Sequence, residues 1–352
     1  MTRAAIVGIG FMGWIHYLAY LRSAEVELVG FASRDADKRA GDWSGIQGNF
    51  GPPGEQIDIS KLTTYGSLEE VLCDDRVDLV DLCTPPHMHT PQVLACLAAG
   101  KHVFCEKPLA LNASDALRMV HAAQEANRLL LVGHVLPFMS EFKFLTAAAE
   151  DRRWGELLGV HLLRTIGPVD WNPDFYDPDR VGGPLVDLHV HDTHLVRLLF
   201  GMPKSVDSRG RLHLGVPQYF ETLFGFEDAE RVVSARGGVI HQHGRPFTHG
   251  FEAHFEDATV QFQFAGFSDN AELMPLKVLH ADGSIERPTL GAGDPVDAFV
   301  AEIDAAAAAV GRGVVCDALR GELAADALVL CQAIDQSVRS GLRVMVGRGA
   351  GQ

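Results

Sequence analysis

The chain has 352 residues, of which 47% are hydrophobic and 22% charged, a composition typical of a globular protein with a sizeable core. Its formal net charge of −16 argues against nucleic acid or an anionic membrane surface as the main partner. No apolar run reaches the roughly 18 residues of a membrane span, and no signal-peptide pattern precedes the first apolar run. We therefore expect an acidic cytoplasmic protein, and the length suggests two domains.

The N-terminal stretch has the pattern of a strand, a glycine-rich turn and the start of a helix. Gly8, Gly10 and Gly13 have the spacing G-x-G-x-x-G. In this motif the first glycine permits a tight turn, the second lets a pyrophosphate approach the backbone, and the third lets helix and strand pack closely. Phosphate oxygens would then bind to the N–H groups at the helix N-terminus. The pattern predicts a Rossmann unit.

A second β-rich run, Val26 to Ala32, follows a helical stretch and completes a strand, helix and strand. The residues after this strand commonly contact the adenosine ribose of a bound dinucleotide. An acidic residue there suits the 2′-hydroxyl of NAD, whereas a small polar residue with an Arg suits the 2′-phosphate of NADP. Ser33 and Arg34 occupy this place, so the sequence favours NADP, although Asp35 leaves NAD open.

Two further strand candidates are each followed directly by polar residues and a proline. The run 77–83 leads into Thr84 and Pro85, and an apolar run ending at Cys105 leads into Glu106-Lys107-Pro108. Residues 41–64 between these segments and the second strand have loop composition and predict an insertion on the domain rim. In open α/β sheets, ligands bind at the carboxyl ends of the strands, so Glu106 and Lys107 are candidate site residues.

Taken in order, the motifs G-x-G-x-x-G, T-P-P-x-x-H and A-G-K-H-V-x-x-E-K-P resemble those of the Gfo/Idh/MocA family of NAD(P)-dependent oxidoreductases. The resemblance implies that Lys107 lies beside the nicotinamide and the substrate, and that Pro108 is cis. It also implies a set of cofactor contacts: Gly8, Gly10, Phe11, Met12, Gly13, Ser33, Arg34, Thr84, Pro85, His89, Glu106, Lys107 and Pro108.

After Gly133 the pattern changes to a run of consecutive strands, closed by two long helical segments. We therefore predict an α/β protein with a doubly wound Rossmann domain, residues 1–133, and an α+β domain, residues 134–352, with a large, mostly antiparallel sheet. The resemblance implies that this second sheet carries the substrate site and an oligomer interface. We expect a homodimer or homotetramer, with no nucleic acid or membrane partner.

The stretch 182–194 is the richest in chemistry, and its pattern predicts one helix from Pro184 to Phe200. On a helix, Asp187, His191 and His194 form one polar stripe. Asp187, His189 and His191 also spell D-x-H-x-H, which on a strand would predict a metal site of the amidohydrolase kind. The resemblance favours another interpretation, because many family members show G-G-x-x-x-D-x-x-x-H with this Asp and His in the active site.

We therefore predict an oxidoreductase that moves a hydride between nicotinamide and a hydroxyl carbon of a sugar, cyclitol or related polyol. Lys107, Asp187 and His191 form the catalytic group, with no metal. The predicted substrate contacts add Trp171, Tyr176, Arg180 and His194. The alternatives are a glycoside-cleaving enzyme that transiently oxidises a ring hydroxyl, a metal-dependent hydrolase using Asp187, His189 and His191, and a cofactor-binding protein without turnover.

Overall fold

The computed structural model describes residues 1–170, 172–291 and 293–347. The chain divides into two compact units. The first contains residues 1–110, 114–139 and 292–325, and the second contains residues 111–113, 140–291 and 326–352. We predicted a division after residue 133, which assigns 292–325 to the second domain, whereas the structure groups this segment with the first unit.

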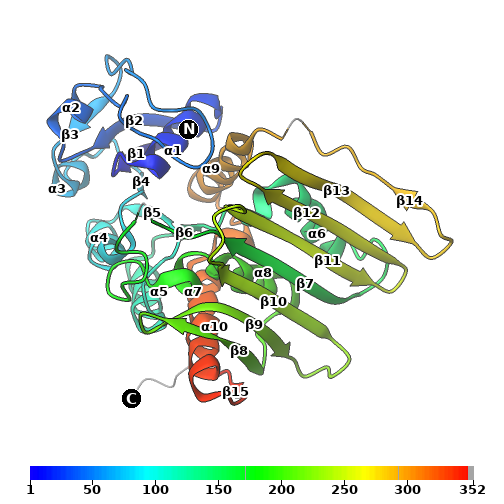
Figure 1. Cartoon of the computed structure of the whole chain (residues 1–352). Coiled ribbons are helices and arrows are strands. Elements are labelled where there is room, and N and C mark those ends of the chain that lie inside the picture. Colours follow the sequence, from blue (N-terminus) through cyan, green and yellow to red (C-terminus); the bar gives the residue numbers. More distant parts are fainter. Residues whose placement is uncertain (171, 292, 348–352) are drawn as a thin grey trace. The chain divides into compact units, whose positions relative to one another are not determined.

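The first unit is built on a six-stranded parallel sheet with the order β3-β2-β1-β4-β5-β6 (Figure 1). Its strands are β1 (Thr2–Val7), β2 (Val26–Ala32), β3 (Thr63–Tyr65), β4 (Leu79–Leu82), β5 (His102–Glu106) and β6 (Leu130–Gly133). Its helices are α1 (Phe11–Arg22), α2 (Ala36–Arg39), α3 (Leu68–Leu72), α4 (Pro86–Ala98), α5 (Ala113–Ala126) and α9 (Pro295–Arg312). The chain runs outward from β1 in both directions, and right-handed crossovers therefore place helices on both faces. The strand order reverses between β1 and β4, and this is where ligands bind in such sheets.

The loop between α2 and β3 packs into the core of this unit. Trp43 is completely buried, and its ring lies 5.0 Å from the rings of both Tyr17 and Phe31. The indole of Trp14, on α1, donates a hydrogen bond to the carbonyl oxygen of Pro52 at 2.9 Å. The predicted rim insertion is therefore anchored by its own tryptophan, which covers one side of α1.

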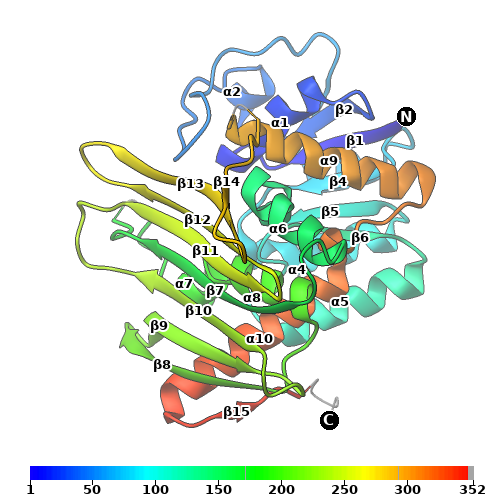
Figure 2. The ribbon, with the colours of Figure 1, turned by 90° about the vertical axis from the view of Figure 1, so that its right-hand side faces the viewer.

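The second unit is built on a nine-stranded sheet with the order β14-β13-β12-β11-β7-β10-β9-β8-β15. Its strands are β7 (Leu157–Ile166), β8 (Ser205–His213), β9 (Val216–Gly225), β10 (Val232–Val239), β11 (Phe247–Phe255), β12 (Ala258–Gly266), β13 (Ala271–His280), β14 (Ile285–Glu286) and β15 (Val344–Met345). Helices α6 (Ser140–Glu150), α7 (Gly183–Asp187), α8 (Val190–Phe200) and α10 (Gly321–Ser340) lie along one face of this sheet (Figure 2). All its pairs are antiparallel except β7 with β10. The predicted fold class is confirmed.

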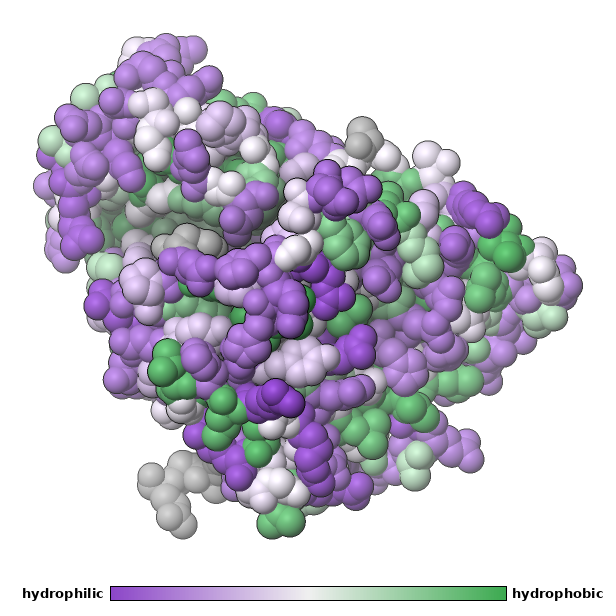
Figure 3. Space-filling model, viewed as in Figure 1, coloured by the Kyte–Doolittle hydropathy of each residue, from purple (hydrophilic) through white to green (hydrophobic). Residues whose placement is uncertain are grey.

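Hydrophilic residues cover most of the face drawn in Figure 3, with hydrophobic residues interspersed among them. None of the helices in the described parts of the chain combines the length and hydrophobicity needed to cross a lipid bilayer.

Candidate active site

The three glycines of the N-terminal motif occupy three different environments. Gly8 has φ +99°, and a Cβ built there would lie 2.8 Å from the carbonyl oxygen of Cys83. A Cβ on Gly13 would lie 2.2 Å from the carbonyl oxygen of Gly8. In contrast, a Cβ on Gly10 would meet nothing within 4 Å. The first and third glycines therefore permit close packing within the chain, while the second borders open space that a ligand can approach.

The start of α1 offers main-chain donors to this space. The amide of Trp14 donates to the carbonyl oxygen of Gly10 at 3.0 Å, and no side chain caps the helix. The amides before Trp14 are those that a helix leaves without an internal partner. Lys38, on α2, donates from Nζ to the carbonyl oxygen of Ile9 at 2.7 Å and brings a cation beside the turn. These groups fit the pyrophosphate of a dinucleotide, and the role of Lys38 had no signal in the sequence.

Substitution of the second and third glycines separates ligand binding from folding. We expect Gly10→Ala to leave the melting temperature nearly unchanged, because its Cβ meets no atom of the chain, and to weaken dinucleotide binding about tenfold or more. We expect Gly13→Ala to lower the melting temperature by several degrees, because its Cβ would overlap the Gly8 carbonyl. Thermal unfolding and titration with dinucleotide measure both quantities. Equal losses of stability would contradict the assignment.

The end of β2 presents the residues predicted to choose between NAD and NADP. Ser33 is half-buried and Arg34 is exposed. Asp35 caps α2, since its Oδ1 accepts the amide hydrogens of Asp37 at 3.0 Å and Lys38 at 3.4 Å. The carboxylate of Asp35, the group that would bind the 2′-hydroxyl of NAD, is thus already hydrogen-bonded to the helix that follows it.

The end of β5 carries the predicted catalytic lysine on a fixed turn. The peptide bond between Lys107 and Pro108 is cis, as the resemblance implies. The amide of Lys107 donates to Glu106 Oε2 at 3.0 Å. The buried ring of His89 contacts two main-chain oxygens at 2.8 Å, that of Pro108 through Nδ1 and that of Thr84 through Nε2. His89 thus links the loop after β4 to the loop after β5, a supporting role that the sequence did not reveal.

The predicted single helix from Pro184 to Phe200 is wrong in one respect, because it is interrupted after Asp187. The amide of His189 bonds to the carbonyl oxygen of Pro184, one residue further back than in a regular α-helix. The ring of His189 is completely buried and lies against Gly237, where a Cβ would come within 2.6 Å of its Nδ1. A glycine on the neighbouring strand therefore makes room for the histidine at this junction.

The break places the predicted polar residues on two short helices. Asp187 ends α7 and His191 lies in the first turn of α8, and both are half-buried. His194 is completely buried. The metal alternative required Asp187, His189 and His191 to share one face of a strand. That geometry is absent, because the backbone is helical on both sides and His189 packs against the ring of Phe220 at 4.8 Å.

A buried ionic cluster beneath α8 was not predicted. Arg164, on β7, contacts both carboxylate oxygens of Asp192, at 3.0 and 3.1 Å. His189 Nδ1 lies 3.2 Å from the same carboxylate. Burial, followed by the charge of Arg164, lowers the pKa of His249 to about 3, so this neighbouring ring is neutral. The cluster fixes α8 to the sheet.

The loop 167–182 holds the remaining predicted substrate contacts. Trp171 lies outside the described residues. The ring of Tyr176 packs edge-on against the ring of His213 at 4.8 Å, and Arg180 pairs with Asp174 at 3.1 Å. Val169 and Phe175 form a small apolar cluster with Val239. In the described residues, Tyr176 and Arg180 therefore have packing and ion-pair partners within the second unit.

The predicted cofactor residues all lie in the first unit, at or near the carboxyl ends of β1, β2, β4 and β5. Of the predicted catalytic group, Lys107 belongs to the first unit, whereas Asp187 and His191 belong to the second. The predicted cofactor residues and Lys107 thus lie together in the first unit, and Asp187 and His191 lie together in the second.

Comparison with known proteins identifies the family. Residues 2–134 match an oxidoreductase family with an NAD-binding Rossmann fold, and residues 142–261 match the Gfo/Idh/MocA C-terminal domain. Myo-inositol 2-dehydrogenase of Thermotoga maritima is 31% identical over 202 residues, which cover 56% of this chain and 55% of that protein. Trans-1,2-dihydrobenzene-1,2-diol dehydrogenase of Mus musculus is 29% identical over 232 residues, covering 64% of this chain and 61% of that protein. These alignments span less than two thirds of either relative.

The fold is shared with solved structures over nearly the whole chain. A levoglucosan dehydrogenase in complex with NADH and levoglucosan superposes with a TM-score of 0.77, covering 99% of this chain and 100% of that chain at 19% identity. The two matched domains follow each other along the chain in the order that the motifs predicted. The chain belongs to the Gfo/Idh/MocA family of oxidoreductases.

Proposed function

We propose that this protein is an NAD(P)-dependent dehydrogenase or reductase that acts on a hydroxyl carbon of a sugar, cyclitol or related polyol. The observation that carries the proposal is the carboxyl edge of the first sheet. The open space beside Gly10 and the turn at Lys107 lie at the ends of β1 and β5, which flank β4 in the sheet. The names of the three relatives each refer to a cyclic compound that bears hydroxyl groups.

The residues divide the chemistry of alcohol oxidation among them. A bound nicotinamide supplies the acceptor for the hydride that leaves the hydroxyl-bearing carbon. His191 takes the hydroxyl proton and passes it to solvent, and Asp187 orients the imidazole. The ammonium group of Lys107 stabilises the negative charge that develops on the oxygen as the carbonyl forms. The alcohol thus loses one hydride and one proton, and the reverse sequence reduces the ketone.

We propose NADP as the preferred dinucleotide. Arg34 is exposed after β2, and Asp35 is engaged as the cap of α2. We expect Arg34→Ala to weaken NADP+ binding by about 10- to 100-fold, the worth of a charge-assisted hydrogen bond. We expect NAD+ binding to change less than about threefold, since no 2′-phosphate is lost. Titration calorimetry measures both, with Arg118→Ala on α5 as the control; equal losses for the two dinucleotides would contradict the preference.

The proposed reaction is tested by direct turnover. The purified protein is mixed with NAD+ or NADP+ and a panel of cyclic polyols that includes myo-inositol, an anhydrosugar and a cyclic diol. We expect the absorbance of reduced nicotinamide to rise with at least one of them. Binding of a dinucleotide without turnover of any polyol, or of any corresponding ketone with the reduced form, would overturn the proposal.

The glycoside-cleaving alternative gives a different result in the same experiment. Sugar release from a glycoside with catalytic dinucleotide and no net absorbance change would support it, because the dinucleotide is regenerated in each cycle. Mass spectrometry of the purified protein identifies any retained dinucleotide. We further propose a homodimer or homotetramer, which light scattering measures.

A further inference from the structure

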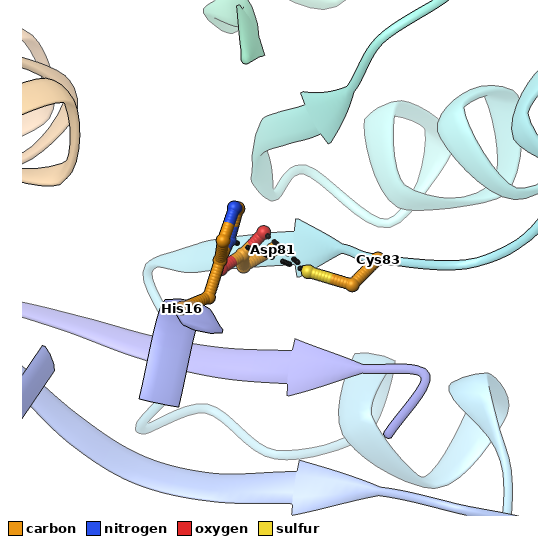
Figure 4. A group of neighbouring side chains, drawn as sticks. All are labelled: His16, Asp81 and Cys83. Atoms are coloured by element: carbon orange, nitrogen blue, oxygen red, sulfur yellow. Dashed lines mark hydrogen bonds and ion pairs between the residues drawn. The ribbon is translucent and has the colours of Figure 1, made fainter. Parts of the chain in front are cut away.

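Four buried polar side chains meet in the first unit, behind the turn that carries Lys107. His16 Nδ1 lies 2.8 Å from Asp81 Oδ2, and His16 Nε2 lies 3.0 Å from Glu106 Oε1. Tyr20, one turn further along α1, donates its hydroxyl hydrogen to Asp81 Oδ2 at 3.0 Å. The side chain of His16 has no exposed surface, and that of Glu106 is 7% exposed. Figure 4 shows His16, on α1, and Asp81, on β4, turned toward each other with Cys83 beside them.

The distances describe a hydrogen-bonded cluster rather than a metal site. The ligand atoms of His16, Asp81 and Cys83 lie within 4.8 Å of one another, so they could surround an ion. However, tetrahedral zinc with bonds of about 2.0 to 2.3 Å holds its ligand atoms well over 3 Å apart. The separation of 2.8 Å between His16 Nδ1 and Asp81 Oδ2 is that of an N–H···O hydrogen bond. Burial raises the pKa of the Cys83 thiol, which keeps its proton.

The contacts fix the charge of His16. An imidazole nitrogen that faces an ionised carboxylate at hydrogen-bond distance must carry a hydrogen, because the carboxylate has only acceptors. Both nitrogens of His16 face carboxylates, so the ring is doubly protonated. Although burial opposes this charge, the negative charge of Asp81 outweighs it together with the other partners, and the pKa of His16 is raised well above 6.5.

The groups around His16 can accommodate its positive charge. Besides Asp81 and Glu106, the ring contacts Cys83, whose Sγ lies 3.3 Å from Nδ1. Tyr20 bonds to Asp81, and Glu302 of α9 lies close enough to feel the charges of His16, Asp81 and Glu106. Burial, followed by the nearby Glu106, raises the pKa of Glu302 well above its ordinary value, so this carboxyl is neutral. The ring of Phe104 stacks on His16 at 5.6 Å. One cation therefore bridges two anions within an otherwise neutral shell.

We propose that His16 is a positioning residue whose imidazolium holds Glu106 through one oxygen, so that the other oxygen fixes the main chain of Lys107. The hydrogen bonds run from Tyr20 to Asp81, across His16 to Glu106, and end at the amide of Lys107, 3.0 Å from Glu106 Oε2. The effect on turnover rests on the proposed function of Lys107. The protonation of His16 does not depend on it.

Nuclear magnetic resonance tests the protonation directly, on the whole protein without dinucleotide. The ring nitrogens of ¹⁵N-labelled histidine report whether one or both carry hydrogen, and the signal missing from His16→Gln assigns the residue. We expect both nitrogens of His16 to stay protonated across the neutral pH range, in which a histidine of ordinary pKa loses its charge. A neutral ring at about pH 7.5 would overturn the proposal whatever the protein catalyses.

Two variants test the positioning, because each keeps one of the two hydrogen bonds. The amide nitrogen of Asn overlays Nδ1 of histidine, and that of Gln overlays Nε2. His16→Asn therefore keeps a donor to Asp81 and loses the one to Glu106, whereas His16→Gln keeps the donor to Glu106. We expect kcat to fall about 10- to 100-fold in His16→Asn, with the KM for dinucleotide within about threefold, and to recover mostly in His16→Gln. Equal kcat in the two folded variants would contradict positioning.

Stability against pH keeps the proposal testable should either variant fold poorly. A histidine whose pKa is raised by folding contributes its full stability below about pH 6.5 and loses it as pH rises through the raised value. We therefore expect the wild type to lose more stability than His16→Gln as pH rises above about 6.5, each measured relative to its own value at acid pH. Tyr17→Phe is the control on the same helix and should follow the wild type, while Tyr20→Phe, which removes the donor to Asp81, should lower stability at every pH.

Discussion

Replacing Lys107 by Met is expected to lower kcat by about 100- to 1,000-fold and to change dinucleotide affinity less than about threefold. Met keeps most of the length of the side chain and removes its charge, so the variant loses the stabilisation of the developing oxyanion. The main chain around it keeps its supports, since Glu106 holds the amide of Lys107 and His89 contacts the carbonyl oxygen of Pro108. Stopped-flow or steady-state turnover with dinucleotide titration measures both parameters.

The same change at the other end of the strand is the control. Lys101 is buried just before β5, and its Nζ donates to the carbonyl oxygens of Asp74 and Val77 at 2.8 and 2.9 Å. Lys101→Met should therefore lower the free energy of unfolding by a few kcal/mol, because two buried hydrogen bonds are lost, and the melting temperature should fall with it. The kcat of the folded protein should stay within about threefold of the wild type. A Lys107→Met protein that turns over substrate at the wild-type rate would remove Lys107 from the mechanism.

The first half of the fold could be read from the sequence because its signals are local. The strand from Val26 to Ala32 has the predicted bounds, and Gly8 and Gly13 make the close approaches within the chain that the glycine motif predicts. Helix α4 begins at Pro86, the second of the two prolines that follow β4, and proline has the fixed φ that suits a first turn.

Features that depend on distant residues could not be predicted in this way. The parallel pairing of β7 with β10 and the return of α9 to the first unit are choices between partners far apart in the chain. The break at Leu188 and His189 depends on Gly237, about fifty residues away, which leaves space for the imidazole. A helical periodicity carries no information on such a gap in the neighbouring sheet.

The cluster around His16 was missed for the same reason. In the sequence, His16 stands within an apolar helical run and resembles a histidine that only fills the core. Its partners lie on two other strands, Asp81 one residue before the end of β4 and Glu106 at the end of β5, and only the parallel sheet order brings them to one side of α1. The nearest sequence signal is the placement of His16 three residues after Gly13, a spacing that directs it back toward the strand ends.

Replacing His191 by Ala is expected to lower kcat by about 100- to 10,000-fold, the range for loss of a general acid or base. Added imidazole should restore part of this activity, because a free base of the same chemistry can enter the space left by the side chain. Rescue distinguishes a proton-transfer role from a structural one, which imidazole does not replace. Turnover with and without imidazole measures it, and loss of activity with no rescue by imidazole or its small analogues would contradict the assignment.

The matched control is His189→Ala, two residues earlier. His189 is buried against Phe220 and Asp192, so we expect this variant to lose stability and to show no rescue by imidazole. A metal centre of Asp187, His189 and His191 would instead make the two histidines equivalent ligands, with parallel losses of bound metal and activity.

Combining His191→Ala with Lys107→Met tests whether the two residues serve one chemical step. If both act in the same transition state, the double variant should lose much less than the product of the single losses, because residues that act as a unit are not additive.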